Sequence, residues 1–178
     1  MKLRMSIVGV GLALLFASAV GAQTKIFGQE KCPKPPEVVG SSEAGDRAGH
    51  TLSVVKSTCT WTTPLEMEGE KSTDGTSVAF AEMTATHATT TGTYVGNMDG
   101  GDKFFVSFHD SAAMKDGKPQ VIKGAWAYTG GTGKLKGIMG KGTYTLTPNA
   151  DGSAVVDVEG EYAVPAAARK KAMDKKPS

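Results

Sequence analysis

Bulky and polar positions alternate along much of the chain after residue 90. Bulky or bare residues occupy even positions and charged or small residues occupy odd ones, as Trp126 and Tyr128 beside Lys123 and Ala127 illustrate. A period of two is typical of a β-strand with one buried face. We therefore predict that the even positions face inward: Tyr94, Phe104, Val106, Phe108, Ile122, Gly124, Trp126, Tyr128, Gly142, Tyr144, Leu146, Val156, Val158, Gly160 and Tyr162.

Seven segments rich in Val, Thr, Phe and Tyr read as strands: residues 51–62, 78–87, 91–98, 103–110, 120–129, 141–147 and 154–164. Turn residues such as Asp99-Gly100-Gly101-Asp102 separate them. Residues 65–71 or the segment before residue 51 supply the eighth strand. Connections this short favour antiparallel neighbours, so we predict an all-β, single-domain, antiparallel eight-stranded β-barrel, with a sandwich as the alternative.

Four glycines stand two residues before a large aromatic residue, and this favours the barrel. The pairs are Gly92 and Tyr94, Gly124 and Trp126, Gly142 and Tyr144, and Gly160 and Tyr162. Residues i and i+2 of a strand share a face, so each pair places bare backbone beside a ring. We interpret the pairs as a device that bends strands for closure.

The chain divides into four parts. Residues 1–22 have a short basic start, an apolar run and small residues before Gln23, which is typical of an export signal; a membrane anchor is the alternative. Residues 23–50 form a Pro-rich entry segment, residues 51–165 the barrel domain, and residues 166–178 a basic tail expected to be flexible. We therefore expect a periplasmic or extracellular protein with no membrane span after removal of the signal.

Charge and cysteine usage narrow the function classes. Residues 1–22 hold two of the 20 basic residues and none of the 18 acidic ones, so the remainder is formally neutral. Nucleic acid is therefore not an expected partner. Cys32 and Cys59 are expected to form a structural disulfide in an oxidising compartment. The three histidines are scattered, so we expect no metal site, and no motif indicates a cofactor.

The predicted interior is aromatic. Its candidate cavity or ligand-binding residues are Tyr94, Phe104, Phe108, Trp126, Tyr128, Tyr144 and Tyr162. One interpretation is a packed core in which these rings fill the barrel. The other is a cavity in which tyrosine hydroxyls orient a small apolar or aromatic ligand.

Glu82 is the one candidate catalytic residue. It shares a strand face with Val78 and Phe80, and a carboxylate on an inward face would act as an acid or base. The opposite face, with Ala79 and Ala81, is equally credible as the inner one, which would leave Glu82 exposed.

A glycine-rich segment, residues 130–142, follows the strand at 120–129. Gly133-Lys134 does not belong to a phosphate-binding loop, because Tyr128 stands where such a loop needs glycine and Leu135 where it needs Ser or Thr. We predict a long corner in which glycines adopt positive φ.

Residues 126–144 resemble the glycine-rich motif of the allene oxide cyclase and dirigent β-barrel superfamily, and most closely its uncharacterised secreted bacterial members. The resemblance is strongest over residues 120–145. It implies an eight-stranded antiparallel barrel, trimeric in many plant members, with a hydrophobic central cavity. Plant cyclases close a fatty-acid epoxide there, and dirigent proteins steer phenolic radical coupling. No catalytic residue of either branch matches a position here, so no activity is carried over.

Three functions follow as hypotheses. The first is an exported, non-catalytic barrel that binds a small apolar or aromatic molecule or serves as a structural envelope protein. The second is a cyclase or isomerase that acts on a hydrophobic substrate inside the barrel. The third is a protein interaction module, including a homo-oligomer.

Overall fold

The computed structural model describes residues 23–165. The predicted export signal and basic tail lie outside these residues. The described chain forms β1 (Thr24–Cys32), β2 (Glu37–Glu43), β3 (Thr51–Thr63), β4 (Glu66–Met67), β5 (Glu70–Met83), β6 (His87–Met98), β7 (Lys103–Lys115), β8 (Lys118–Pro119), β9 (Ile122–Gly131), the short 3-10 helix η1 (Gly133–Leu135), β10 (Met139–Pro148) and β11 (Ala154–Ala163).

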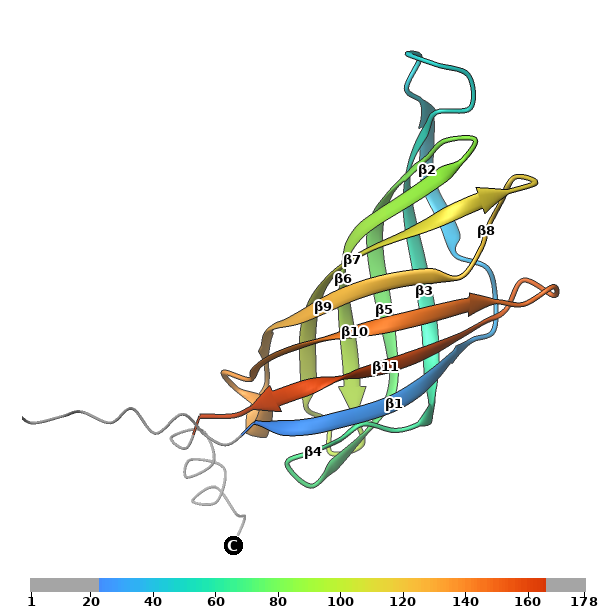
Figure 1. Ribbon diagram of the computed structural model, residues 1–178. Coiled ribbons are helices and arrows are strands. Elements are labelled where there is room, and N and C mark those ends of the chain that lie inside the picture. The colour runs from blue at the N-terminus through green and yellow to red at the C-terminus, as the bar shows by residue number, and fades with distance from the viewer. Residues whose placement is uncertain (1–22, 166–178) are drawn as a thin grey trace, which may run out of the picture.

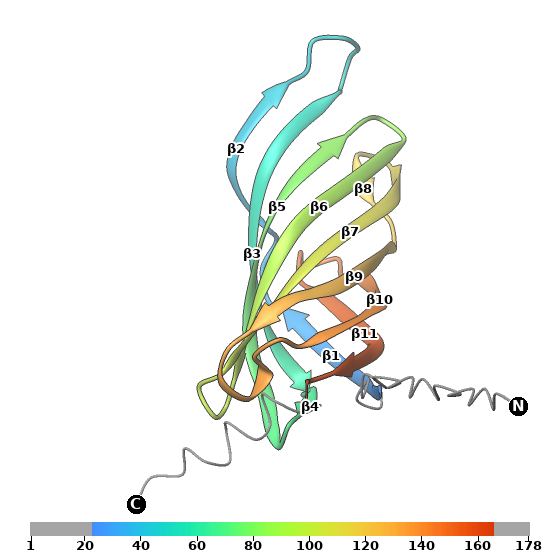
Figure 2. The same ribbon diagram turned by 90° about the vertical axis from the view of Figure 1, so that its left-hand side faces the viewer.

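Eight of these strands form a closed antiparallel barrel (Figures 1 and 2). The order around it is β1, β3, β5, β6, β7, β9, β10 and β11, and β11 pairs again with β1. The strands β2, β4 and β8 are additions to its rims. The prediction of an all-β, eight-stranded antiparallel barrel is confirmed, and the sandwich alternative is excluded.

The eighth barrel strand is β1, which lies inside the predicted entry segment. Its residues alternate between buried and exposed: Ile26, Glu30 and Cys32 are buried, whereas Phe27 and Lys31 are exposed. The other candidate, residues 65–71, forms β4 and the start of β5 instead. The sheet therefore begins at Thr24, before the boundary expected at residue 51.

The two ends of the barrel differ. Side chains that are almost fully buried close the end near β4 and η1, namely Leu65, Met67, Leu135, Ile138 and Val164. At the other end β2 pairs only with the first half of β3, and β8 pairs only with the end of β7, so the strands extend beyond the ring (Figure 1). We refer to these as the closed end and the open end.

The disulfide and the glycine corner both form as predicted. Cys32 and Cys59 are bonded, which ties the end of β1 to β3. Within the corner Gly133 and Gly137 have φ of 47° and 75°, a region that favours glycine. The backbone N–H of Lys134 donates to Asp102 Oδ2 at 2.8 Å, and its ammonium lies 2.9 Å from Glu70 Oε1. The backbone N–H and the ammonium group of Lys134 are thus both paired with carboxylates.

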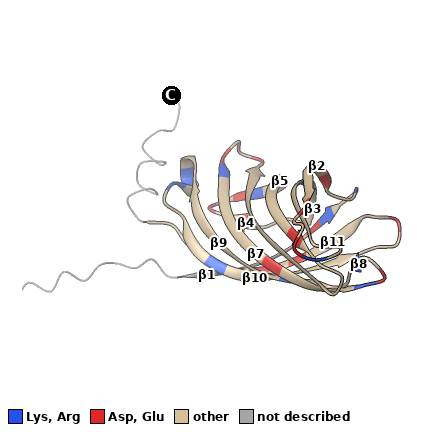
Figure 3. Cartoon of the chain, turned by 90° about the horizontal axis from the view of Figure 1, so that it is seen from above, with Lys and Arg blue, Asp and Glu red and all other residues tan. Residues whose placement is uncertain are grey.

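Basic and acidic residues are interspersed around the described barrel instead of gathering on one face (Figure 3). No helix long and apolar enough to cross a bilayer occurs between residues 23 and 165.

Candidate functional site

A cavity of about 210 Å³ lies inside the barrel. Six of the seven predicted aromatic residues line it: Tyr94, Phe104, Phe108, Trp126, Tyr128 and Tyr144. Trp61 of β3 adds a further ring. The predicted inward parity of these residues is therefore correct, and the rings surround a space without filling it.

The cavity opens toward the open end. Phe104 and Leu65 at the closed end are each 2% exposed, whereas Phe108, Tyr144 and Leu146 nearer the open end are all partly exposed. Solvent therefore reaches the cavity from the open end, and the plug of apolar side chains blocks the other.

Glycines make room for the rings across neighbouring strands. Gly92 pairs with Phe108 and Gly142 pairs with Trp126 in the antiparallel registers. A Cβ added at Gly92 would lie 2.8 Å from the Phe108 ring, and one added at Gly142 would lie 2.6 Å from Trp126, too close for unstrained contact. Gly96 opposite Phe104 and Gly124 opposite Tyr144 repeat the arrangement. The partner of each of these glycines is thus a ring on the next strand, and not the aromatic residue two positions along the chain.

Ring packing holds the cavity wall in shape. Trp126 and Tyr128 have centroids 5.0 Å apart and meet edge to face, and Phe108 and Tyr144 meet in the same way at 6.1 Å. Both separations lie in the range in which aromatic pairs attract beyond their buried area. These contacts thus hold neighbouring rings of the wall against one another.

A buried carboxyl group, Glu30, lies in the wall opposite these rings. It is 5% exposed, and the Tyr94 hydroxyl donates a short hydrogen bond to its Oε1. Trp61 Nε1 donates to the same Tyr94 oxygen at 3.1 Å. Burial raises the pKa of Glu30 to about 7; the hydrogen bond from Tyr94 opposes this shift, and the charge of Asp74 adds to it. Glu30 therefore exchanges a proton near neutral pH.

A second carboxyl group, Asp110 of β7, repeats the arrangement nearer the open end. The hydroxyl of Tyr144 donates a short hydrogen bond to its Oδ2. Burial raises the pKa of Asp110, although hydrogen bonds from Tyr144 and Thr90 partly offset the effect. Burial likewise raises the pKa of Tyr94 and of Tyr144, so both phenols stay neutral donors.

The other tyrosines have structural partners. The Tyr128 hydroxyl donates to Met67 Sδ at 3.1 Å. Tyr162 is buried outside the cavity lining, and its hydroxyl accepts a hydrogen bond from the backbone N–H of Glu68 at 3.3 Å. Tyr162 thus supports the barrel wall without facing the cavity.

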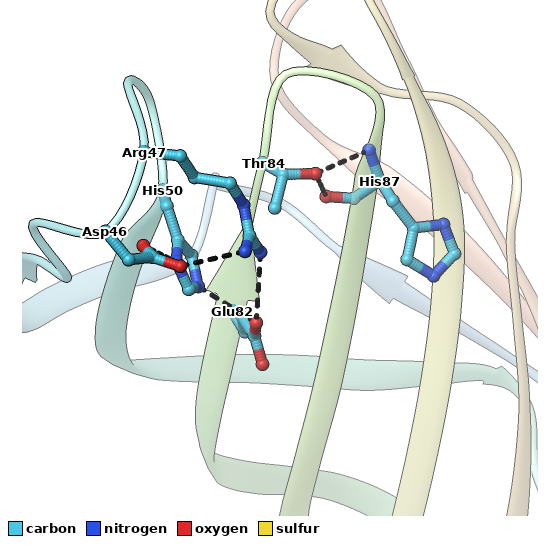
Figure 4. A network of polar contacts seen from close by, with 6 residues as sticks. All are labelled: Asp46, Arg47, His50, Glu82, Thr84 and His87. Carbon is cyan, nitrogen blue, oxygen red and sulfur yellow. Dashed lines mark hydrogen bonds and ion pairs between the residues drawn. The ribbon is translucent and has the colours of Figure 1, made fainter.

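Glu82 does not line the cavity. Ala79 and Ala81 are buried, whereas Phe80 is 49% exposed, so the alanine face is the inner one. The Glu82 carboxylate lies 2.9 Å from His50 Nε2 on the outside of the open end, with the Arg47 guanidinium 3.9 Å away (Figure 4). It holds the loop before β3 against β5.

The sequence analysis did not identify Asp110, Trp61 and Glu30 as cavity residues. Asp110 has the parity of Phe108, so extending the alternation by one step would have found it. Trp61 shares the parity of Cys59 on β3 in the same way. Glu30 lies in a strand that was not predicted, because the prolines and charged residues of residues 23–50 weaken the strand pattern. Among residues 23–165 no group of three or more potential ligands is placed to hold a metal ion.

No family model and no curated protein matches the chain. Similar solved structures include a protein of unknown function from the DUF3224 family of Shewanella oneidensis MR-1, with 17% identity, a TM-score of 0.46, and coverage of 80% of this chain and 97% of that one. They also include a pterocarpan synthase dirigent protein, with 16% identity, a TM-score of 0.45, and coverage of 79% and 89%. The similarity concerns the fold alone.

Proposed function

We propose that this barrel binds a small, mainly apolar aromatic molecule in its cavity. The observation that carries the proposal is the ring-lined space of about 210 Å³ with two carboxyl–tyrosine pairs in its wall. Ligand sites are mostly apolar with a few polar groups that fix orientation, and this cavity has that composition.

The volume limits the size of the ligand. A dry cavity of about 150 Å³ takes up benzene. The space here therefore suits one ring with a short side chain and is too small for a long fatty acid.

Tryptophan fluorescence provides the test. The chain has two tryptophans, Trp61 and Trp126, and both line the cavity, so the whole signal reports on it. Titration with phenethyl alcohol is expected to give a saturable change. The variant Ser57→Phe places a ring at a lining position and should weaken binding by at least about tenfold. Its control, Thr58→Phe, lies on the outer face of the same strand and should bind like the wild type.

If the folded wild type gives no saturable change with phenethyl alcohol or with any similar single-ring probe, the binding proposal fails. Equal binding by the two phenylalanine variants would place the site elsewhere.

A cyclase or isomerase is the second candidate, and Glu30 is the observation that favours it. Its pKa of about 7 suits a group that takes and returns a proton at neutral pH. Turnover of a bound probe that disappears in Glu30→Gln, with binding retained, would support catalysis. Binding without turnover in both proteins would support the binder.

We also propose that the protein acts after export and self-associates. The disulfide is compatible with an oxidising compartment. The outer face of β3 and β5 exposes Val54, Val78 and Phe80, and Val54 pairs directly with Phe80. An apolar row of this kind is suited to burial against a second copy of the chain.

A further inference from the structure

We propose that the preferred ligand is a small aromatic amine, bound as its ammonium ion between the Glu30 carboxylate and the surrounding rings. This inference rests on the proposed function, because it names the ligand class for the same cavity.

The cavity has charge of one sign only. Glu30 and Asp110 line it, and no Lys, Arg or His residue occurs among the described residues of the lining. The groups that face Glu30 are the Tyr94 hydroxyl from β6 and the Asp74 carboxylate from β5, with Asp110 and Tyr144 across the space. A cation is therefore the charge that this interior lacks.

The raised pKa of Glu30 is consistent with the absence of a positive charge beside it. Burial and the neighbouring Asp74 both raise its pKa, and the one group that opposes them is a neutral phenol. An ammonium ion in the cavity would favour the ionised carboxylate and form a charge-assisted hydrogen bond with it. Ligand binding at neutral pH would then release the Glu30 proton.

The rings add a second attraction for a cation. Tyr94, Trp61 and Trp126 lie in the lining together with Tyr128 and Phe104. The face of an aromatic ring attracts an ammonium ion, and Trp and Tyr are the strongest such partners. Rings around a carboxylate thus suit a ligand with an apolar body and a cationic end.

The same arrangement disfavours an anion. A carboxylate ligand would enter a space that offers two acidic groups and no positive charge, so it would lose its hydration without compensation. The affinity of a neutral alcohol should lie between those of the amine and the carboxylate, because the alcohol can donate a hydrogen bond to Glu30 but carries no charge.

Three probes of nearly equal size test the proposal: phenethylamine, phenethyl alcohol and phenylacetate, each titrated into the full chain with tryptophan fluorescence as the readout. At about pH 8 phenethylamine is expected to bind at least about tenfold more tightly than the alcohol, and phenylacetate more weakly than both. Between about pH 5.5 and about pH 8 its affinity should rise by about thirtyfold as Glu30 ionises, while the affinity of the alcohol changes little.

Variants separate the charge from the shape of the site. Glu30→Gln keeps the side-chain volume and should remove both the preference for the amine and its pH dependence, with alcohol binding retained. Glu159→Gln, on the exposed face of β11, should behave like the wild type. If Glu30→Gln does not fold, the ranking of the probes and the pH profile of the wild type still decide the question.

The outcomes distinguish this inference from the proposed function. Saturable binding of the alcohol with equal or weaker binding of the amine overturns the inference and leaves the proposed function standing. No binding of any of the three probes overturns both.

Discussion

Glu30→Gln should change how the stability of the protein depends on pH. In the folded chain burial raises the pKa of Glu30 from 4.5 to about 7. The folded state therefore holds this proton more tightly than the unfolded state does. The resulting stabilisation is fully present below about pH 4.5 and is lost as the pH rises through about 7.

The shift in pKa fixes the magnitude. At 1.36 kcal/mol for each pH unit, a rise from 4.5 to about 7 corresponds to about 3 kcal/mol at alkaline pH. Glutamine keeps an oxygen that accepts from the Tyr94 hydroxyl but cannot ionise. The variant should not show this loss of stability. The difference in unfolding free energy between the variant and the wild type should therefore grow in favour of the variant by about 2–3 kcal/mol between about pH 5 and about pH 8.5.

Urea unfolding of both proteins across this pH range measures the gap. Contributions from the titratable groups that both proteins share cancel in the difference. The exposed variant Glu159→Gln controls for the loss of a carboxylate as such. A gap that stays constant from about pH 5 to about pH 8.5 would refute the reasoning, because Glu30 would then titrate as it does in the unfolded chain.

Three further predictions concern the scaffold. Replacing both Cys32 and Cys59 with alanine opens a loop of 27 residues and should lower the free energy of unfolding, measured with urea, by about 3.5 kcal/mol. A reducing agent should destabilise the wild type but not this variant. A loss of less than about 1 kcal/mol would contradict the chain-entropy estimate. Gly142→Ala places a Cβ against backbone atoms and the Trp126 ring and should lower the free energy of unfolding, measured with urea, by about 1–3 kcal/mol. Gly40→Ala is the control and should be nearly neutral, because nothing lies within 4 Å of the added Cβ. Equal effects of the two substitutions would refute the packing argument. If the wild type self-associates, Phe80→Lys should make it monomeric, and light scattering measures the difference in mass. A wild type that is itself monomeric would exclude self-association.

The inward-facing rings were predictable because strand parity is a binary signal. Once one residue of a strand, such as Trp126, is assigned to the inner face, the alternation assigns all the other residues of that strand. The short connections leave little freedom in the order of the strands. The barrel and its aromatic lining follow from these two facts.

Glu30 was not predictable, for a physical reason. A glutamate in an alternating pattern indicates the solvent face, and its partner Tyr94 lies 64 residues away in the sequence. Only the register of the closed sheet brings the two together. The position of Glu82 was ambiguous because Phe80, which shares its strand face, is apolar yet exposed. From the sequence, either face of β5 could therefore have been the inner one.

The pairing of four inward rings, Phe104, Phe108, Trp126 and Tyr144, with a glycine on the next strand separates two properties that most cores combine. Backbone pairing holds the barrel together, while the ring and glycine pairs set the shape of its interior. Trimming Phe108 opposite Gly92, or moving the bulk from one strand to the other, would redraw the cavity without changing a single ladder hydrogen bond. New cavity shapes would then arise through coupled changes at such paired positions, and these pairs are where an engineer would begin.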